Sequence, residues 1–324
     1  MKHQTTGRIE CQGAAALAAL RKRAAEWEVP LDEIPCGLCF RVWDSVARLE
    51  QRDGEVLIDL EAPEERLLQT LQSSLAELFG EHGLTAQWDN VREGALAPGL
   101  ALMTVESVER LSPGFTRVTL RGPEAARFAQ GGLHFRLLLP PKARPPVWPR
   151  ICASGRTIWP DGDDALHRPV YTTVMQGGDW LAFDIFRHTG SPTTNWADRM
   201  PLGETVGILG PGGGMCPEGS PLVLLGDQTA LPAIRRMLDL ATGEVTARVF
   251  CAAEDMAELV NDTRVTRSND LLADLETLTL PPAGAHIWFA GSAEAARQAR
   301  RILSARGLGK RDFTAAAYWS PIKG

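Results

Sequence analysis

The chain has 324 residues, which at about 150 residues per domain indicates two or three domains. A hydrophobic share of 44% and a charged share of 23% exclude a wholly disordered chain, and a formal net charge of −6 argues against nucleic acid as the main partner. No apolar run reaches the ~18 residues of a transmembrane helix, so no membrane span is predicted. The apolar stretch 13–20 lacks a signal-peptide cleavage pattern, and we therefore expect a cytoplasmic protein.

Six scattered cysteines indicate a reducing compartment rather than a disulfide framework. Only Cys36 and Cys39 share a C-x-x-C spacing, and neither a second pair nor a histidine cluster accompanies them. A zinc site is therefore not predicted, and we expect no metal ligands in the protein. A redox dithiol is the alternative, but it belongs at a strand-to-helix turn, whereas another strand-like run follows here. Two reduced cysteines near the start of a strand are the favoured interpretation.

Residues 1–95 are predicted to form a small α+β domain. Apolar residues at helical spacing predict a first helix through Ala14, Leu17, Leu20, Ala24 and Trp27. Residues 39–49 and 55–60 are typical of strands, and Asp53-Gly54 before the second is a hairpin signal. Leucines at helical spacing over residues 62–79 predict a second helix.

Residues 100–218 are predicted to form a six-stranded antiparallel β-barrel. They show little helical periodicity, and turns rich in glycine and proline separate six strand-like runs. The runs cover residues 105–108, 115–120, 134–139, 171–174, 180–186 and 205–209. Residues 140–164, between the third and fourth runs, carry six prolines and no clear period, which predicts a long inserted loop.

Residues 219–324 are predicted to form an α/β domain, because strand-like and helical segments alternate along them. This order is typical of a parallel sheet with helices on both faces. The expected strands cover residues 222–225, 248–252 and 286–290, and the expected helices 230–240 and 293–305.

Two turns in the last domain, 226–229 and 290–292, follow strands and precede helices. Ligands bind at the carboxyl ends of parallel strands, and glycine lets the backbone approach a ligand closely. Neither turn has the G-x-G-x-x-G pattern, so ordinary tight turns are an equal alternative. The neighbouring pair Arg235-Arg236 is predicted to lie on a solvated helix face.

Three further segments have a composition suited to phosphate or ring binding. Arg168, Tyr171 and Thr172 offer a cation, an aromatic ring and a hydroxyl, which suits a ring cofactor with a diphosphate, although an ordinary strand has similar composition. The hydroxyl-rich loop 189–195 could hold phosphate. Residues 210–214 are four glycines and a proline, for which an interdomain hinge is favoured over a phosphate loop.

A series of short motifs follows one order along residues 105–319. It comprises Val105-Glu106-Ser107, Ser112-Pro113-Gly114-Phe115-Thr116-Arg117-Val118, Tyr171-Thr172, Asp184-Ile185-Phe186-Arg187-His188, Trp196-Ala197, Pro201-Leu202-Gly203-Glu204, Gly210-Pro211-Gly212-Gly213, Gly226-Asp227-Gln228-Thr229-Ala230-Leu231-Pro232-Ala233-Ile234 and Ala317-Tyr318-Trp319. The series resembles the siderophore-interacting protein family, flavin-dependent ferric-siderophore reductases of the ferredoxin reductase-like superfamily. Residues 1–95 are similar to an uncharacterised small domain that some of these proteins carry in front.

The resemblance implies that the barrel binds FAD, with Tyr171 and Thr172 beside the isoalloxazine and Arg168 nearby. It implies a loop for the diphosphate and adenine half formed by His188, Gly190, Thr193, Thr194 and Trp196. It also implies turns facing the flavin and the nicotinamide, formed by Asp227, Thr229, Ala230 and Gly291, with Trp319 returning to the flavin face. Thr172 and Asp227 are the implied catalytic residues.

The implied reaction passes electrons from NADPH or NADH through FAD to the ferric iron of a bound siderophore. Ferrous iron binds hard oxygen chelators less tightly, so the reduced metal leaves. The family holds the siderophore with basic residues, of which Arg136 matches one and Lys323 is a substitute for another. The protein itself needs no metal ligand for this reaction.

The chain departs from the family at several of these positions. Pro169 stands where the family has its arginine, Gln228 and Ser292 replace glutamates, and Thr314 and a glycine occupy two basic positions. Two alternatives therefore stay open. One is an FAD protein that takes electrons from ferredoxin or reduces a non-iron acceptor, and the other is a non-enzymatic siderophore-binding protein.

Overall fold

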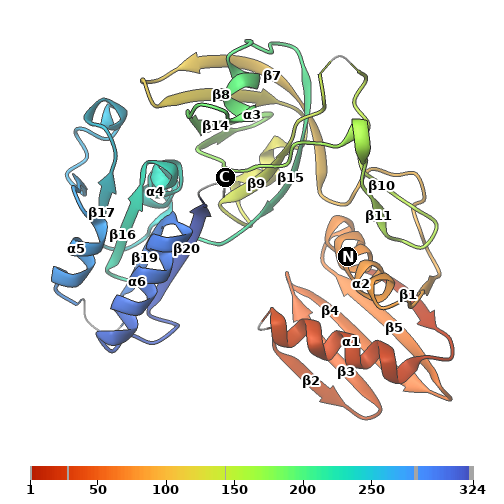
Figure 1. Ribbon diagram of the computed structural model, residues 1–324. Helices are drawn as coiled ribbons and strands as arrows, with labels where there is room; N and C mark the ends of the chain where they lie inside the picture. The colour runs from red at the N-terminus through yellow and green to blue at the C-terminus, as the bar shows by residue number, and fades with distance from the viewer. Residues whose placement is uncertain (1, 28, 143, 281–283, 321–324) are drawn as a thin grey trace. The chain divides into compact units, whose positions relative to one another are not determined.

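A computed structural model describes residues 2–27, 29–142, 144–280 and 284–320. The chain forms two compact units, which are described separately (Figure 1). Unit 1 combines Met1–Leu100 with Pro140–Leu166, and unit 2 combines Ala101–Leu139 with His167–Gly324. The residues predicted to be a barrel loop therefore belong to the N-terminal unit, and both of the other predicted domains lie in unit 2.

Unit 1 is an antiparallel sheet with two helices over one face (Figure 1). Its strand order is β2-β3-β4-β5-β1-β6. The core lies between the sheet and helices α1 (Gly13–Glu26) and α2 (Glu65–Glu81), whose leucines at helical spacing are buried. The strands are β1 (His3–Ile9), β2 (Leu31–Ile34), β3 (Gly37–Val42), β4 (Ser45–Arg52), β5 (Glu55–Ala62) and β6 (Gln87–Trp88).

The predicted strand 39–49 is two strands in the structure. The chain turns at Trp43 and Asp44, whose φ angles of 51° and 57° are those of a tight hairpin turn between β3 and β4. The second predicted hairpin is confirmed, because Asp53 and Gly54 have φ angles of 50° and 87° between β4 and β5. Strands β1 and β2 were not predicted.

Residues 140–166 are not a plain loop, which corrects the prediction for 140–164. Strands β10 (Arg150–Ile151) and β11 (Thr157–Ile158) form a short hairpin, and the Thr157 hydroxyl lies 2.9 Å from the Ser73 hydroxyl of α2. The backbone of residues 149–151 also hydrogen-bonds to residues 94–97. These bonds attach the segment to unit 1.

The larger sheet of unit 2 is antiparallel and has seven strands in the order β12-β9-β15-β7-β8-β14-β13. Seven are found where six were predicted, because β13 follows the predicted run 171–174 and was not itself predicted. Strand β12, which matches that run, pairs with β9, whereas β13 pairs with β14 at the opposite end of the sheet. The strands are β7 (Leu100–Arg110), β8 (Phe115–Arg121), β9 (His134–Leu138), β12 (Val170–Thr172), β13 (Met175–Gly177), β14 (Trp180–Phe186) and β15 (Thr205–Gly212).

The second sheet of unit 2 is parallel, as predicted, with strand order β18-β17-β16-β19-β20. Separate cores on its two faces are closed by α4 (Leu231–Leu240) on one side and by α5 (Leu271–Thr277) and α6 (Ala293–Ala305) on the other. The strands are β16 (Leu222–Asp227), β17 (Val245–Phe250), β18 (Val265–Arg267), β19 (His286–Ser292) and β20 (Phe313–Trp319).

The glycine-rich segment 210–214 is paired structure, so the hinge prediction is wrong. Strand β15 extends to Gly212, which pairs with His134, and the Leu133 amide donates to the Gly214 carbonyl at 3.0 Å. A Cβ atom on Gly132, whose φ is 141°, would lie 2.6 Å from the Gly212 carbonyl oxygen. Gly132 is therefore needed for the close approach of its backbone to that of Gly212.

Candidate functional site

Asp227 lies where three predicted site residues meet. Strands β16 and β19 are parallel neighbours, so the turns that follow them share one edge of the sheet. One Asp227 carboxylate oxygen accepts from the Thr229 amide (2.9 Å) and hydroxyl (2.6 Å), and the other accepts from Trp319 Nε1 (2.8 Å). A Cβ on Gly291 would lie 3.1 Å from this second oxygen. Gly291 thus leaves room for a carboxylate that fixes both the turn and β20.

Tyr171 and Thr172 lie side by side on β12 but on opposite faces of the sheet. In the register with β9, Tyr171 opposes Phe135 and Thr172 opposes His134. The Tyr171 ring is half-buried and packs against Phe183, with 5.0 Å between the centroids. Burial raises the pKa of Tyr171 to about 12, so its hydroxyl stays protonated at neutral pH.

His134, which sequence reasoning did not select, joins Thr172 to the parallel sheet. Its Nδ1 lies 3.0 Å from the Thr172 hydroxyl, and its Nε2 lies 3.1 Å from the Tyr318 hydroxyl on β20. Burial, and secondarily the positive charge of Arg236, lower the pKa of His134 to about 4. The ring is therefore neutral at physiological pH and carries one N–H donor and one acceptor nitrogen.

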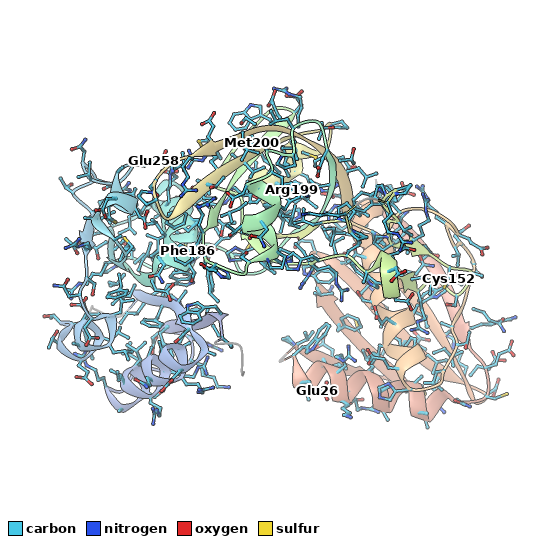
Figure 2. The ribbon with its side chains drawn as sticks, turned by 45° about the horizontal axis from the view of Figure 1, so that its top comes forward. Glu26, Cys152, Phe186, Arg199, Met200 and Glu258 are labelled. Carbon is cyan, nitrogen blue, oxygen red and sulfur yellow. The ribbon has the colours of Figure 1, made fainter. Side chains whose placement is uncertain are left out.

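The predicted diphosphate loop leads into the short helix α3 (Pro192–Ala197), which contains Thr193, Thr194 and Trp196. His188 is exposed and its ring stacks on that of Phe186, which is labelled in Figure 2. Gly190 has a φ of 83°, and the Ser191 hydroxyl caps the helix by accepting from the Thr194 amide. The Thr194 hydroxyl oxygen is buried without a hydrogen-bond partner among the described residues. A buried polar atom without a partner is costly, so this hydroxyl is suited to an additional ligand.

Two other members of the predicted loop have partners within the protein. The Thr193 hydroxyl lies 3.1 Å from Nε2 of His167. The Trp196 ring is 5% exposed, belongs to the core of the antiparallel sheet, and donates from Nε1 to Glu204 at 3.1 Å. The indole is therefore mainly a packing group of this core, and its contact with a cofactor stays a prediction.

The predicted cations Arg136 and Arg168 lie at the same end of the β9–β12 pair. Arg136 is exposed, opposes Val170, and donates from Nη1 to the Arg168 carbonyl at 2.9 Å. The third predicted cation, Lys323, lies outside the described residues.

Buried arginines join the two sheets of unit 2. Arg117 on β8 makes two hydrogen bonds to Asp184, at 2.7 and 2.8 Å, and two to Glu258 (Figure 2), which also pairs with Arg235 on α4. Burial lowers the pKa of Arg117, but its bonds with Asp184 and Glu258 outweigh this and hold the pKa above its ordinary value. Arg117 is therefore fully charged.

Arg236, the neighbour of Arg235, is 6% exposed, so the predicted solvated face is wrong for this residue. It donates to the carbonyls of Thr173 (2.7 Å), Phe128 (2.9 Å) and Ala129 (3.1 Å). These bonds hold α4 against the strand segment that carries Thr172.

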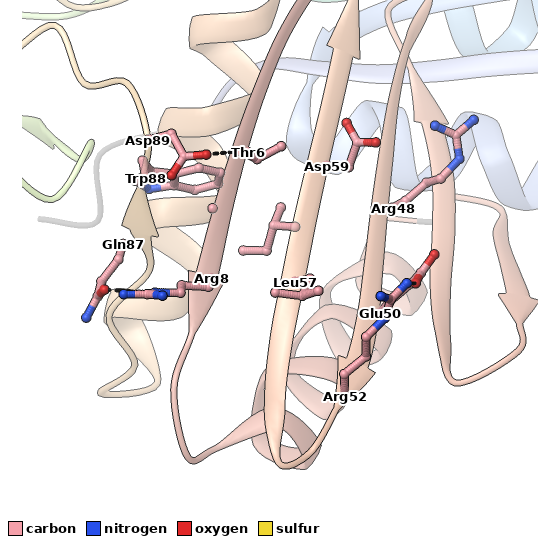
Figure 3. A pocket seen from close by; sticks show the side chains of 12 residues that line it. Thr6, Arg8, Arg48, Glu50, Arg52, Leu57, Asp59, Gln87, Trp88 and Asp89 are labelled. Atoms are coloured by element: carbon pink, nitrogen blue, oxygen red, sulfur yellow. Dashed lines mark hydrogen bonds and ion pairs between the residues drawn. The ribbon is translucent and has the colours of Figure 1, made fainter.

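Unit 1 has a hollow of about 550 Å³ on the sheet face opposite the helices. Figure 3 shows that it is lined by side chains from β1, β4, β5 and β6, with charges of both signs that include Arg48 and Asp59. None of the predicted site residues that the structure describes lines it. Within the described ranges, no group of three or more His, Cys, Asp or Glu residues could hold a metal ion, and no helix is long and apolar enough to cross a membrane.

Both parts of unit 2 match models of known protein families. Residues 104–215 match the model of the siderophore-interacting FAD-binding domain, and residues 220–321 match that of the siderophore-interacting protein, together more than half of the chain. The chain is 27% identical over 236 residues to the NADPH-dependent ferric-chelate reductase of Escherichia coli strain K12, covering 67% of this chain and 91% of that protein.

Two solved structures extend the comparison. A siderophore utilization protein from T. fusca has a TM-score of 0.57 and 28% identity, covering 72% of this chain and 97% of that one. A ferredoxin NADP+ reductase from Neisseria gonorrhoeae, determined with FAD and NADP, has a TM-score of 0.51 at 14% identity, covering 68% of this chain and 99% of that one. This second likeness shows a ferredoxin-reductase-like fold.

Proposed function

Because the chain belongs to the siderophore-interacting protein family, we propose that it is an FAD-dependent reductase that uses NAD(P)H to reduce the iron of ferric siderophores and related ferric chelates. The reduced iron is released in the cytoplasm. The matches over residues 104–321, which contain every site residue except Lys323, carry the proposal. The similarity to an NADPH-dependent ferric-chelate reductase supports it.

The described residues fit FAD. The unpartnered Thr194 hydroxyl offers a hydrogen bond to a phosphate oxygen, and Gly190 and Thr193 belong to the same loop. We assign the diphosphate to this loop together with His188 and Arg168, and the isoalloxazine to Tyr171 and Thr172. In this assignment the antiparallel sheet acts as a six-stranded barrel, with β12 and β13 counted as one strand, and residues 219–324 bind NAD(P)H.

When bound, FAD supplies the conversion of a two-electron donor into single-electron transfers to iron. The chain's own residues hold the reactants in place. Asp227 fixes the turn of Thr229 and Ala230, and Gly291 leaves room for the Asp227 carboxylate in the neighbouring turn. We assign the nicotinamide to this edge of the sheet, at the carboxyl ends of the parallel strands. Trp319 is tied to the same carboxylate. The Thr172 hydroxyl is the polar group that faces the flavin.

Recognition of the iron substrate is assigned to exposed cations. Ferric siderophores with oxygen donors carry negative charge, and a local cation attracts them even on a chain whose net charge is negative. Arg136 is exposed near Arg168, and Lys323 is the second candidate. Iron is bound through its chelator in this proposal, so the protein supplies no metal ligand.

The proposal is tested on the purified full-length chain. We expect flavin absorbance in the protein as isolated or after FAD is added, bleaching under NADPH or NADH, and formation of an Fe(II)–ferrozine complex from a ferric catecholate. Arg136→Gln is expected to raise KM for the ferric chelate severalfold without changing the flavin spectrum. A protein that refuses FAD, or a reduced flavin that yields no Fe(II), would contradict the proposal.

The FAD assignment has a matched pair of variants. Thr194→Val removes the unpartnered hydroxyl and should weaken FAD binding about tenfold, since a hydrogen bond to a charged group contributes roughly 1.5 kcal/mol or more. It should leave the stability of the FAD-free protein unchanged or higher. Thr5→Val removes an equally buried, unpartnered hydroxyl from unit 1 and should not change FAD affinity. Equal affinities for FAD in titrations of both variants would contradict this assignment.

A further inference from the structure

His134 lies between the two sheets of unit 2 and contacts the proposed flavin site, and the family resemblance gives it no role there. His134 stands on β9 opposite Thr172, and it makes hydrogen bonds through both ring nitrogens. Its far partner, Tyr318, comes from the parallel sheet and is 184 residues away in the sequence. The Tyr318 ring is held edge-on against both His134 (5.7 Å between centroids) and Trp288 (5.9 Å). Thr172, His134 and Tyr318 therefore form a continuous chain of hydrogen bonds, and packing holds the Tyr318 ring in place.

A neutral imidazole gives such a chain a direction, because only one of its nitrogens carries a proton. If Nδ1 carries it, His134 donates to the Thr172 oxygen, and the Thr172 proton is free for another acceptor. If Nε2 carries it, Thr172 must donate to His134, and only its oxygen is left for a ligand. The tautomer of His134 thus decides whether Thr172 offers a proton or a lone pair.

The other end of the chain selects between the two directions. A phenol is a better proton donor than an aliphatic hydroxyl, because its pKa is near 10. Burial raises the pKa of Tyr318, so its hydroxyl stays protonated and has a proton to donate. Tyr318 therefore donates to Nε2 of His134, the proton of the ring resides on Nδ1, and Nδ1 donates to Thr172.

We propose that His134 is a positioning residue for the flavin site: held by Tyr318 as its Nδ1–H tautomer, it orients the Thr172 hydroxyl so that this hydroxyl donates its proton to bound FAD. The inference rests on the proposed function, in which Thr172 faces the flavin. A donor that is fixed in advance stabilises the more negative, reduced flavin without reorganisation during the reaction.

The flavin reduction potential measures this role directly. His134→Phe keeps a ring but removes both bonds, and in the FAD-loaded protein it should lower the ratio of reduced to oxidised flavin against a reference dye about tenfold, or ~30 mV for a two-electron couple. Tyr318→Phe, which removes one oxygen, should lower it two- to fivefold. The matched control is His286→Phe. His286 is also half-buried and bonds a threonine hydroxyl (Thr314, 2.9 Å), but it begins β19, at the end of the strand opposite Gly291. This control should stay within twofold of the wild type.

The outcomes are distinguishable. If folded, FAD-loaded His134→Phe and Tyr318→Phe both keep the wild-type ratio, the inference is overturned while the proposed function stands. If His134→Phe does not fold or load, Tyr318→Phe decides in the same way. A wild type that takes up no FAD overturns the proposed function itself. Nitrogen NMR of His134 in the FAD-free protein is expected to show the Nδ1–H tautomer, and the Nε2–H tautomer would overturn the inference.

Discussion

His134 also connects the site to the stability of the fold. In an unfolded chain a histidine has a pKa near 6.5, whereas burial lowers the pKa of His134 to about 4. Between these values the unfolded chain binds more protons than the folded one. The free energy of unfolding therefore falls as the pH drops from 6.5 to 4, and this contribution is fully present above pH 6.5.

We expect His134 to cause an acid-sensitive step in stability. Its share of the loss at pH 4 is at most about 3 kcal/mol, because a partly exposed ring is screened by solvent. His167 and His286, whose pKa values burial also lowers, act in the same direction. Urea unfolding at pH 7, 6, 5 and 4 should show a shallower decline for His134→Phe than for the wild type. Parallel curves would contradict a buried neutral His134.

At the residue scale, a site residue can be predicted from the sequence when it belongs to a recognisable local pattern. Asp227 and Gly291 follow buried strands, and Thr172 follows the aromatic residue of a recognisable pair, so all three could be selected. His134 and Arg236 could not, because their partners are distant in the sequence and an isolated His or Arg has many ordinary uses. Arg236 even lies in a helix turn that appears solvated until its contacts with Phe128 and Thr173 are known.

At the element scale, α4 is fixed to the antiparallel sheet by Arg236. Its guanidinium supplies hydrogen bonds to three carbonyls at the end of β12 and near η1 (Ala125–Ala129). These carbonyls would otherwise be buried with fewer partners, and each unsatisfied group costs roughly 1–3 kcal/mol. The fixed strand end is the one that carries Thr172, so the same contact supports the proposed flavin site.

Arg236→Met is expected to lower the free energy of unfolding of unit 2 by about 2–4 kcal/mol, since methionine retains the apolar stem but no donor. The control is Arg301→Met on α6, an exposed arginine whose replacement should change stability by less than about 0.5 kcal/mol. Urea unfolding of both variants measures the difference. Equal stability of the two variants would show that desolvation of the Arg236 charge cancels its three bonds.

Elements were predicted where an apolar face or an apolar run is bounded by turn signals. Strands β18 and β20 of unit 2 were not predicted, whereas the helices of unit 1 and strands β16, β17 and β19 satisfy both conditions. Strand β1 does not: Thr5, Gly7 and Ile9 form its inward face, and only one of these is strongly apolar. Its place in the sheet is set by pairing with β5, about 50 residues later in the chain. A pairing between such distant segments cannot be predicted from the local sequence.

At the scale of the whole molecule, the chain leaves unit 2 and returns to it at one point. Leu139 and His167 face each other and exchange both backbone hydrogen bonds, at 2.9 and 3.0 Å. The residues between them are part of unit 1. They bond residues 94–97 and Ser73, and Gly155 and Arg156 lie against Trp88 and Gly80. Residues 140–166 are thus inserted into the sequence of unit 2 but are packed as part of unit 1.

Replacing residues 141–165 by Asn-Gly should therefore affect the two units differently. The pair Leu139–His167 can be closed by a short turn, so the amides of β16 and β19 should exchange with deuterium at wild-type rates. Amides of α2 and β6 should exchange at least tenfold faster, because the contacts over Ser73 and Trp88 are lost. FAD affinity should stay unchanged, since every proposed FAD ligand lies outside the insertion. Faster exchange in β16 and β19, or wild-type exchange in α2, would mean that the segment stabilises unit 2 instead.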